Sequence, residues 1–294
     1  MVKDQLVLEK NGKIALVYRI ETAEAVALAK KVAEYLKNKG FEVFTAPEQK
    51  LVPGTKAIKS AKQLDGLELA IVLGGDGTYL HAVRLLEGRS VPILGFNMGS
   101  LGFLTAHSAD DTFKVINDAI AGKMGLRPRS MIHAVILRKG RKRAEYHALN
   151  DVVIERGSMS QLINTAIYSD GFLVSEVKAD GFIIASPSGS TAYNLAAGGP
   201  LLHPEAQVLV VTPVAPHSLT SRPLIFPDKG ELSFKLDGKT QKAHFIVDGQ
   251  KQSEITAQDE VVVTRSCYDH WVVRAPEHNF FHLLREKLKF GDRN

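Results

Sequence analysis

Hydrophobic positions in the first hundred residues follow an alternation of strands and helix. Lys13–Tyr18 is a short, mostly apolar run that predicts a buried strand. Residues 21–39 follow with apolar side chains on one helical face, and Gly40 is a typical stop signal for this helix. Three more apolar runs predict strands, at 41–44, 67–73 and 91–95. This order predicts parallel βαβ units, which bind ligands at the carboxyl ends of their strands.

The pattern changes after about residue 125, where helical spacing fades and short β-rich runs replace it. These runs predict strands at 133–137, 151–154, 165–168, 181–185, 208–211, 232–236, 245–247, 261–265 and 271–274. Asp-Gly pairs at 170–171, 180–181, 237–238 and 248–249 are typical of tight hairpin turns. Seven of the twelve prolines lie between Pro187 and Pro227, which predicts that this stretch is mostly loop.

Helical spacing returns at residues 277–290, where Phe281, Leu284 and Leu288 share one face. The chain is therefore predicted to contain an N-terminal α/β, Rossmann-like domain at 1–125 and a β-rich domain, a β-sandwich, at 126–275. The segment 276–294 is predicted to be a C-terminal helix that returns to the first domain.

Composition excludes several classes of protein. Of the 294 residues, 45% are hydrophobic and 23% are charged, as in ordinary globular proteins, which excludes a disordered chain. The single cysteine, Cys267, excludes an internal disulfide framework and favours a reducing compartment. No apolar stretch is long enough to span a membrane, and the first residues are too charged for a secretory signal. We expect a cytoplasmic protein that does not bind membranes.

The chain has a net charge of +5, and its basic residues include one dense run at 138–143. This run lies between two strand-like segments, 132–137 and 145–154, so a solvated hairpin turn is favoured over a phosphate-binding patch. A nucleic-acid partner is not expected, because proteins that bind nucleic acids concentrate basic residues on one face.

The loop Gly74-Gly75-Asp76-Gly77-Thr78 carries the strongest chemical signal. It follows a predicted strand and opens a helical pattern, so its amide groups can meet phosphate oxygens at a helix N-terminus. Asp76 is the one carboxylate among these glycines. A structural alternative is that Asp76 only caps the following helix, but the density of glycine favours a functional role. Neither a dinucleotide-binding G-x-G-x-x-G nor a P-loop is present, which argues against a hydride-transfer Rossmann enzyme and a P-loop NTPase.

Several segments together resemble the NAD kinase family. The loop at 74–78 is followed by Asn97 to Thr105, by the pair Asn150-Asp151, and by a glycine-rich block from Asp180 to Pro200. A late Pro-His-Ser-Leu-Thr-Ser-Arg-Pro stretch, 216–223, also resembles the family. The Gly-Gly-Asp-Gly loop is shared with diacylglycerol and sphingosine kinases, whereas the block at 180–200 is specific. The pair departs from the family's usual Asn-Glu, because Asp151 is one methylene shorter.

This resemblance implies transfer of the γ-phosphoryl group of ATP to the 2′-hydroxyl of the adenosine ribose of NAD, which makes NADP. Asp76 would be the catalytic proton acceptor, and Gly74, Gly75, Gly77 and Thr78 would form a phosphate-binding loop. The implied NAD-binding residues are Asp76, Gly77, His81, Asn150, Asp151, Lys178, Asp180, Thr191, Ala192, Tyr193, Asn194, Leu195, Ala196 and Gln250. For three of these a structural reading stays open: His81 as a surface histidine, Lys178 as an exposed lysine at a strand edge, and Tyr193 as a core residue.

The resemblance also implies partners and competing functions. The expected partners are NAD and ATP, with Mg²⁺ or another divalent cation carried by ATP, and a homo-oligomer, dimer or tetramer, is expected. No metal site made of protein side chains is predicted, because the His278 and His282 spacing has no third ligand. The alternatives are a lipid or sphingoid kinase that shares the Gly-Gly-Asp-Gly loop, and a non-catalytic NAD(P) sensor. The sequence leaves open whether the phosphoryl donor is ATP or polyphosphate, and whether the acceptor is NAD or NADH.

Overall fold

The chain divides into two units in a computed structural model, which describes residues 4–49, 52–157, 161–238, 242–276, 279–289 and 291. The first unit contains residues 1–128 and 270–294, and the second contains residues 129–269. The second unit is thus inserted between two parts of the first. The predicted combination of an α/β domain, a β-rich domain and a C-terminal helix is confirmed.

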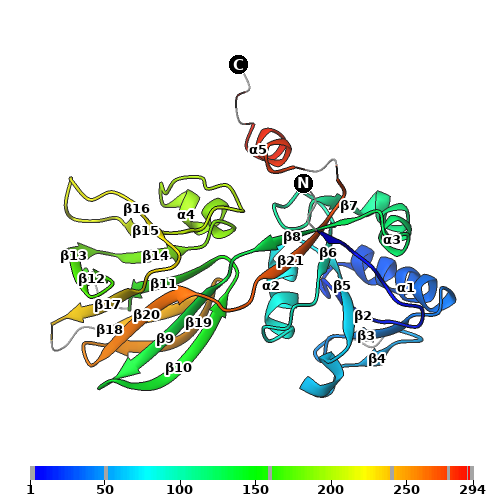
Figure 1. The fold of residues 1–294 in the computed structure, drawn as a ribbon, viewed down its shortest axis with the longest axis horizontal. Coiled ribbons are helices and arrows are strands. Elements are labelled where there is room, and N and C mark those ends of the chain that lie inside the picture. Colours follow the sequence, from blue (N-terminus) through cyan, green and yellow to red (C-terminus); the bar gives the residue numbers. More distant parts are fainter. Residues whose placement is uncertain are drawn as a thin grey trace. The chain divides into compact units, whose positions relative to one another are not determined.

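The first unit is built on a mainly parallel sheet (Figure 1). Its strand order is β1-β8-β21-β6-β5-β2-β3-β4, and the short β7 also pairs with β6. The pairings from β21 to β4 are parallel, and β1 is antiparallel to β8. The strands are β1 (Asp4–Gln5), β2 (Lys13–Tyr18), β3 (Glu42–Thr45), β4 (Lys56–Ala57), β5 (Leu67–Gly74), β6 (Ile93–Asn97), β7 (His107–Ser108), β8 (Gly125–Arg129) and β21 (His270–Arg274).

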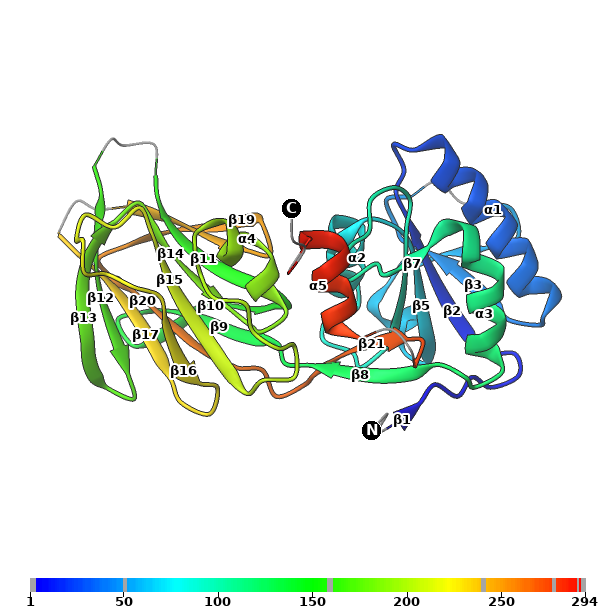
Figure 2. The same ribbon diagram turned by 90° about the horizontal axis from the view of Figure 1, so that it is seen from above.

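Helices cover both faces of this sheet, because its central strands are apolar on both sides. α1 (Ala23–Asn38) and α3 (Thr112–Ile120) pack with alternate residues of β2, β5 and β6 in one core, and α2 (Asp76–Leu85) lies on the opposite face (Figure 2). The remaining helix, α5 (Phe280–Leu288), follows β21. Two short 3₁₀ helices, η1 (Ala61–Leu64) and η2 (Ala109–Asp111), connect strands and helices.

The second unit consists of two antiparallel sheets, which we name after one strand of each, β9 and β11. The β9 sheet has the order β10-β9-β20-β17-β12-β13, and the β11 sheet has the order β16-β15-β14-β11-β18-β19. The β9 sheet contains β10 (Arg141–Ala148), β9 (Ile132–Arg138), β20 (Asp259–Arg265), β17 (Leu232–Asp237), β12 (Ile163–Ser169) and β13 (Phe172–Ala179). The β11 sheet contains β16 (Leu224–Pro227), β15 (Val208–Val214), β14 (Gly181–Ala185), β11 (Asp151–Arg156), β18 (Lys242–Val247) and β19 (Gln250–Thr256).

Alternating residues of the two sheets form one shared core, as in a β-sandwich. Ile132, Ala134 and Ile136 of β9 pack in the same cluster as Val152 and Ile154 of β11. The β11 sheet is also buried on its other face, where a smaller cluster of Val153, Ile183, Ala185, Leu202 and Val210 lies. η3 (Gly189–Thr191) and α4 (Tyr193–Ala196) belong to the segment that follows β14. This segment contains the glycine-rich block identified in the sequence.

Two of the four Asp-Gly pairs form hairpin turns, and the other two do not. Asp170 and Asp248 have φ values of 49° and 46° and connect paired strands, β12 to β13 and β18 to β19. The prediction is wrong for 180–181 and for 237–238, because β13 and β14, like β17 and β18, belong to different sheets. Gly238 has a φ of 106°, whereas Gly181 has no positive φ and lies where a Cβ atom would overlap the carbonyl oxygen of Ile154. The same dipeptide therefore serves different needs, and it does not by itself distinguish a hairpin from a crossing between sheets.

The prediction of one strand-like segment at 145–154 is wrong. β10 ends at Ala148 in the β9 sheet, and β11 begins at Asp151 in the β11 sheet. The break occurs because the carboxylate of Asp248 accepts hydrogen bonds from the N–H groups of residues 149, 150 and 151. Asn150 and Asp151 therefore lie where the chain changes sheets.

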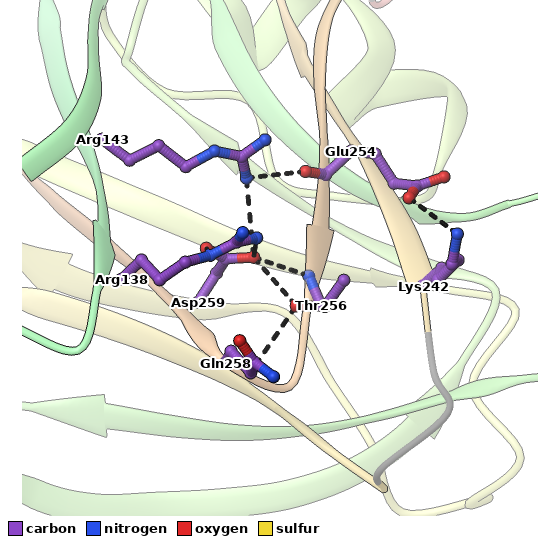
Figure 3. Close-up of polar contacts among 7 residues, drawn as sticks. All are labelled: Arg138, Arg143, Lys242, Glu254, Thr256, Gln258 and Asp259. Atoms are coloured by element: carbon purple, nitrogen blue, oxygen red, sulfur yellow. Dashed lines mark hydrogen bonds and ion pairs between the residues drawn. The ribbon is translucent and has the colours of Figure 1, made fainter.

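The basic run 138–143 is a hairpin turn between β9 and β10, as predicted, with Lys139 and Gly140 at positive φ. Two of its arginines, Arg138 and Arg143, bind protein groups (Figure 3). Arg138 makes two hydrogen bonds of 2.8 Å to the two oxygens of Asp259, and Arg143 lies 3.5 Å from the same carboxylate. Asp259 also accepts from the N–H and the hydroxyl of Thr256. The run therefore joins the β9–β10 hairpin to the turn between β19 and β20 through one carboxylate.

No helix within the described residues has both the length and the apolar character that crossing a bilayer requires.

Candidate active site

The glycine loop of the first unit connects the end of β5 to the start of α2. Gly74 is required by packing, because a Cβ atom there would overlap the side chain of Thr78. Gly75 and Gly77 differ, since a Cβ atom at either position meets no atom within 4 Å and neither has a positive φ. The fold does not need glycine at these two positions. Bare backbone beside a helix N-terminus is what a phosphate group approaches most closely.

Asp76 is the first residue of α2, and its carboxylate faces the loop at 103–105. Oδ2 accepts a hydrogen bond of 3.0 Å from the N–H of Phe103. Oδ1 accepts three, from the N–H of Leu104 and from the N–H and hydroxyl of Thr105, at 3.0–3.1 Å. The helix-capping alternative for Asp76 is wrong, because Gly75 is the N-cap and these four donors hold the carboxylate.

A buried arginine supports the loop that holds Asp76. Arg274 of β21 donates a hydrogen bond of 2.6 Å to the carbonyl oxygen of Phe103. Burial lowers the pKa of this guanidinium, although the nearby Tyr79 and Asp76 act in the opposite direction. Gly102 completes the arrangement, since a Cβ atom there would overlap both the Asp76 carboxylate and the Thr105 hydroxyl. Loop 102–105 is thus shaped around one carboxylate.

The C-terminal helix adds a cation to the same place. Nζ of Lys287 in α5 lies 3.7 Å from Oδ2 of Asp76 and 4.8 Å from the centre of the Phe103 ring. Both side chains are about one-third exposed, at 32% and 31%. The first unit therefore combines bare glycines, a fixed carboxylate and one partly exposed ammonium group, which is a set suited to phosphate chemistry.

His81 lies further along α2 and pairs with another group. Its Nε2 atom contacts Oε1 of Glu48. The hydroxyl of Tyr79, by contrast, lies 2.8 Å from Nε2 of His270 and joins α2 to β21. The structure thus places Gly74, Gly75, Asp76, Gly77 and Thr78 together, and it places His81 beside Glu48.

In the second unit, the turn at Asp248 holds the crossing at 149–151. The Asp248 carboxylate accepts N–H groups of Leu149, Asn150 and Asp151 at 2.8–3.2 Å, and its own N–H donates to the carbonyl oxygen of Asp151. Gln250 begins β19 two residues later and is exposed. Asn150, Asp151 and Gln250 are therefore brought to neighbouring turns of the β11 sheet.

Two buried polar atoms near this crossing lack a hydrogen-bond partner among the described residues. They are Oδ1 of Asn150 and Oγ of Ser188. Asn150 is only 8% exposed, and its carbonyl oxygen accepts from the N–H of Ser186, which fixes the backbone here. Because a buried polar atom without a partner is costly, these two atoms point to a ligand that supplies hydrogen-bonding groups.

Asp151 occupies an unusual environment for a carboxylate. Burial, and secondly the charge of Asp248, raise its pKa from 3.8 to about 7. Near neutral pH this side chain can therefore carry a proton and donate a hydrogen bond as well as accept one. Both roles suit a sugar diol.

The block 191–196 is divided between exposed and structural residues. Tyr193 is 44% exposed, so its reading as a core residue is wrong. Asn194 is fully buried, and its amide donates to the carbonyls of Ser190 and Pro200 while its Oδ1 accepts from Thr212. Among the other residues of the block, Thr191, Ala192 and Leu195 are half-buried and Ala196 is exposed. Asn194 thus holds the block against β15.

Lys178 and Asp180 lie at the end of β13. Lys178 is exposed, and its carbonyl oxygen accepts from the N–H of His217, which joins this strand end to the stretch 216–223. Asp180 forms an ion pair of 2.8 Å with Arg156.

Sequence reasoning missed Arg274, Lys287 and the role of Asp248. Asp248 carried a signal, because an aspartate in a turn commonly accepts backbone N–H groups. Arg274 and Lys287 carried none that a single sequence reveals, since each lies about two hundred residues from Asp76 along the chain.

Known proteins share both units of this chain. Residues 14–124 match the ATP-NAD kinase N-terminal domain, and residues 149–275 match the ATP-NAD kinase C-terminal domain. A NAD kinase of Bdellovibrio bacteriovorus is 77% identical over 292 residues, which cover 99% of this chain and 96% of that protein. A NAD kinase of Acidobacterium capsulatum is 37% identical over 289 residues, or 96% of this chain and 99% of that protein.

Solved structures show the same fold at lower identity. The crystal structure of yeast NADH kinase complexed with NADH has a TM-score of 0.90 and 24% identity, and covers 97% of this chain and 89% of that chain. An NAD kinase from Archaeoglobus fulgidus in complex with ATP has a TM-score of 0.70 and 23% identity, with 93% and 98% covered. The two matched domains and the 77% identical relative decide the family. The chain therefore belongs to the NAD kinase family, and it is a kinase.

Proposed function

We propose that this chain transfers the γ-phosphoryl group of ATP to the 2′-hydroxyl of the adenosine ribose of NAD, with Asp76 as the proton acceptor. The observation that carries this assignment is the unequal use of the two Asp76 oxygens. Oδ1 accepts three hydrogen bonds, whereas Oδ2 accepts one from a backbone N–H. A carboxylate oxygen has two lone pairs. Nζ of Lys287, at 3.7 Å, forms an ion pair with Oδ2 without hydrogen bonding to it, so Oδ2 keeps one lone pair for a substrate hydroxyl.

In this reaction the hydroxyl oxygen forms a bond to the γ-phosphorus as the bond to the β–γ bridging oxygen breaks. The hydroxyl proton passes to Oδ2 of Asp76, and ADP leaves with the bridging oxygen. Phosphoryl transfer depends mainly on positioning and on neutralising charge. Phosphate oxygens would be positioned by the bare backbone at Gly75 and Gly77. The ammonium group of Lys287 would neutralise part of their charge.

Mg²⁺ fits this donor set as a companion of ATP. The loop offers a single carboxylate, and its Oδ1 atom already accepts three hydrogen bonds. A cation here would therefore be held largely by phosphate oxygens and water. When bound, the cation supplies further neutralisation of phosphate charge.

The second unit would bind ribose hydroxyls. Oδ1 of Asn150 is a buried acceptor without a described partner, and Asp151 can donate as well as accept near neutral pH. Tyr193 offers an exposed ring for stacking, and Lys178 offers a cation for the pyrophosphate. His81, Asp180, Gln250 and the block Thr191–Ala196 stay assigned to NAD binding as predictions.

The test is an assay of NADP formation from NAD, ATP and Mg²⁺ with wild-type protein and the Asp76→Asn variant. The amide keeps the shape of the carboxylate but cannot take a proton, so kcat should fall by about 10²–10⁴-fold. Far-UV circular dichroism and thermal unfolding check that the fold is intact. An Asp76→Asn variant that keeps most of its rate would show that another group takes the proton.

Parallel reactions test the alternatives. Sphingosine and diacylglycerol replace NAD in one arm, and polyphosphate and NADH replace ATP and NAD in two others. NAD binding without turnover by any donor would contradict the proposed transfer.

We also propose that the protein is a cytoplasmic homo-oligomer, a dimer or tetramer. The single cysteine fits a reducing compartment. Light scattering coupled to size exclusion measures the molar mass against 32.1 kDa per chain.

A further inference from the structure

Two histidines lie face to face on the outer surface of the β9 sheet. His133 of β9 and His147 of β10 are directly paired in the strand register, and their rings stack with centroids 4.9 Å apart and an interplanar angle of 19°. Their neighbours Ile132, Ala134 and Ala148 point into the sandwich core, so both imidazoles point away from it.

A carboxylate completes the group. Glu145 lies two residues before His147, on the same face of β10, and its Oε1 atom is 2.7 Å from Nε2 of His133. One ligand atom from each of the three side chains lies within 4.8 Å of the others. Lys142 contacts the other oxygen of Glu145 at 2.7 Å, which leaves Oε1 directed at the histidines.

A hydroxyl group contacts the Nδ1 atom of each ring. Oγ1 of Thr264 is 3.4 Å from Nδ1 of His133, and Oγ of Ser266 is 3.2 Å from Nδ1 of His147. The ring of Tyr268 packs against His147 with centroids 4.6 Å apart. In metal sites a ligating histidine commonly uses its second nitrogen in this way, which fixes the ring and presents the other nitrogen. The Nε2 atoms are therefore the ones directed at a shared ligand.

We propose that His133, Glu145 and His147 form a binding site for a late first-row transition metal ion, with Zn²⁺ as the best fit. Two imidazole nitrogens and one carboxylate oxygen are a known zinc donor set, and a water molecule would fill the fourth position. Tetrahedral Zn²⁺ with bonds of about 2.1 Å needs donors about 3.4 Å apart. Nε2 of His133 and Oε1 of Glu145, now 2.7 Å apart, must therefore separate by about 0.7 Å, and a pair at the 4.8 Å limit must close by about 1.4 Å. The cation replaces the hydrogen bond between His133 and Glu145, and the proton of that bond passes to water.

This site is separate from the proposed phosphoryl transfer. None of its residues is assigned to NAD or ATP, and Mg²⁺, which prefers oxygen ligands, does not suit two imidazoles. A negative result here would leave the proposed function untouched.

The test is calorimetric titration of the full-length, metal-free protein with Zn²⁺, in the presence of millimolar Mg²⁺. We expect one strong site per chain, and at least tenfold weaker binding in His147→Ala and in Glu145→Gln. Co²⁺ should give the intense visible bands of a tetrahedral complex in wild-type protein only. Glu145→Gln keeps the size of the side chain, so it stays informative if His147→Ala is unstable.

Two controls distinguish this site from adventitious binding. Cys267→Ser removes the only thiol, which is exposed and lies next to Ser266, and His203→Ala removes an exposed histidine elsewhere in the unit. Both variants should keep the strong site. The proposal fails if Cys267→Ser abolishes binding, if His147→Ala and Glu145→Gln bind Zn²⁺ like wild type, or if Mg²⁺ displaces the metal. In NMR spectra, Zn²⁺ should shift the His133 and His147 ring signals before those of the other histidines.

Discussion

At the scale of single residues, two carboxylates of this chain have opposite surroundings. Asp76 accepts four hydrogen bonds from loop 103–105, which fix its orientation. Asp151 is 4% exposed and lies beside a second carboxylate, Asp248, so its protonated form is favoured. Two identical carboxylates are thus suited to different tasks by their surroundings, which are hydrogen-bond donors in one case and burial beside another carboxylate in the other.

The raised pKa of Asp151 predicts a specific pH dependence of stability. Between pH of about 4 and 7 the folded protein keeps a proton on Asp151 that the unfolded chain releases, so the free energy of unfolding falls as pH rises through this window. Asp151→Asn imitates the protonated side chain and removes this effect. The free energy of unfolding of the variant minus that of wild type should therefore be greater at pH 8 than at pH 5, by on the order of 1–3 kcal/mol.

Urea unfolding at both pH values measures this difference. The same free energy difference between variant and wild type at pH 5 and pH 8 would contradict a raised pKa of Asp151. The Asp180→Asn variant is a suitable control, because Asp180 is a half-buried carboxylate in an ion pair.

Gly77 should respond to substitution in a way that separates stability from activity. A Cβ atom at Gly77 meets nothing in the protein, and the residue lies within α2, so Gly77→Ala should stabilise the fold by about 0.5–1 kcal/mol. The added methyl group would obstruct a phosphate, so kcat/KM for ATP should fall at least tenfold. Urea unfolding and initial rates measure the two effects.

Gly102→Ala is the matched contrast, because its Cβ atom would overlap the Asp76 carboxylate. Stability and activity should both fall in this variant. Unchanged kcat/KM in Gly77→Ala would mean that no ligand approaches that backbone.

At the scale of secondary structure elements, single aspartates in turns decide how strands are connected. Asp248 ends β10 and starts β11 by accepting three backbone N–H groups, and Asp259 joins the β9–β10 hairpin to the turn before β20. The hydrophobic pattern predicted Gly181–Ala185 as a strand with the bounds of β14. The same pattern could not divide 145–154, because the group that divides it lies 98 residues from Asn150.

Removal of the Asp259 carboxylate should destabilise the second unit. Asp259→Ala leaves the guanidinium of Arg138 and the N–H of Thr256 without their partner, and the side chain it removes is fully buried. We expect a loss of about 2 kcal/mol in the free energy of unfolding, with KM for NAD and ATP unchanged.

Thermal and urea unfolding measure this loss, with Glu254→Ala as the control. The Glu254 carboxylate forms an exposed ion pair of 3.0 Å with Lys242, so its removal should change stability by less than about 0.5 kcal/mol. Equal effects of the two substitutions would contradict a special role of Asp259.

At the scale of the whole molecule, the sequence predicted the fold class and the chemistry-bearing loop but not the complete surroundings of Asp76. The glycine loop is local, so five consecutive residues reveal it. Arg274 supports the loop that holds Asp76, and Lys287 lies beside its carboxylate. Both come from the other end of the chain, and the parallel pairing of β21 with β6 brings them there. Non-local contacts of this kind leave no periodicity in a single sequence.

Two truncated chains should separate the structural and chemical roles of the C-terminal segment. A chain of residues 1–269 lacks β21, which lies between β8 and β6, so its first unit should not fold. A chain of residues 1–279 keeps β21 and lacks α5, so it should fold but bind ATP at least tenfold more weakly without Lys287.

Limited proteolysis with mass spectrometry and ATP titration distinguish these outcomes. Protection of the first unit in the 1–269 chain would show that β21 is dispensable. Unchanged ATP affinity in the 1–279 chain would remove Lys287 from the proposed phosphate contacts.

The insertion of one unit between the two parts of the other has a consequence for biosynthesis. A ribosome completes the second unit before it releases β21, because the 141 residues 129–269 are translated in between. At about 5–20 residues per second, the nascent first unit waits roughly 7–28 s with the part of the β6 edge that β21 will cover, at Ile93, unpaired. Exposed strand edges attract other chains. Chaperone demand during translation should therefore concentrate on the first unit, although its sequence emerges first.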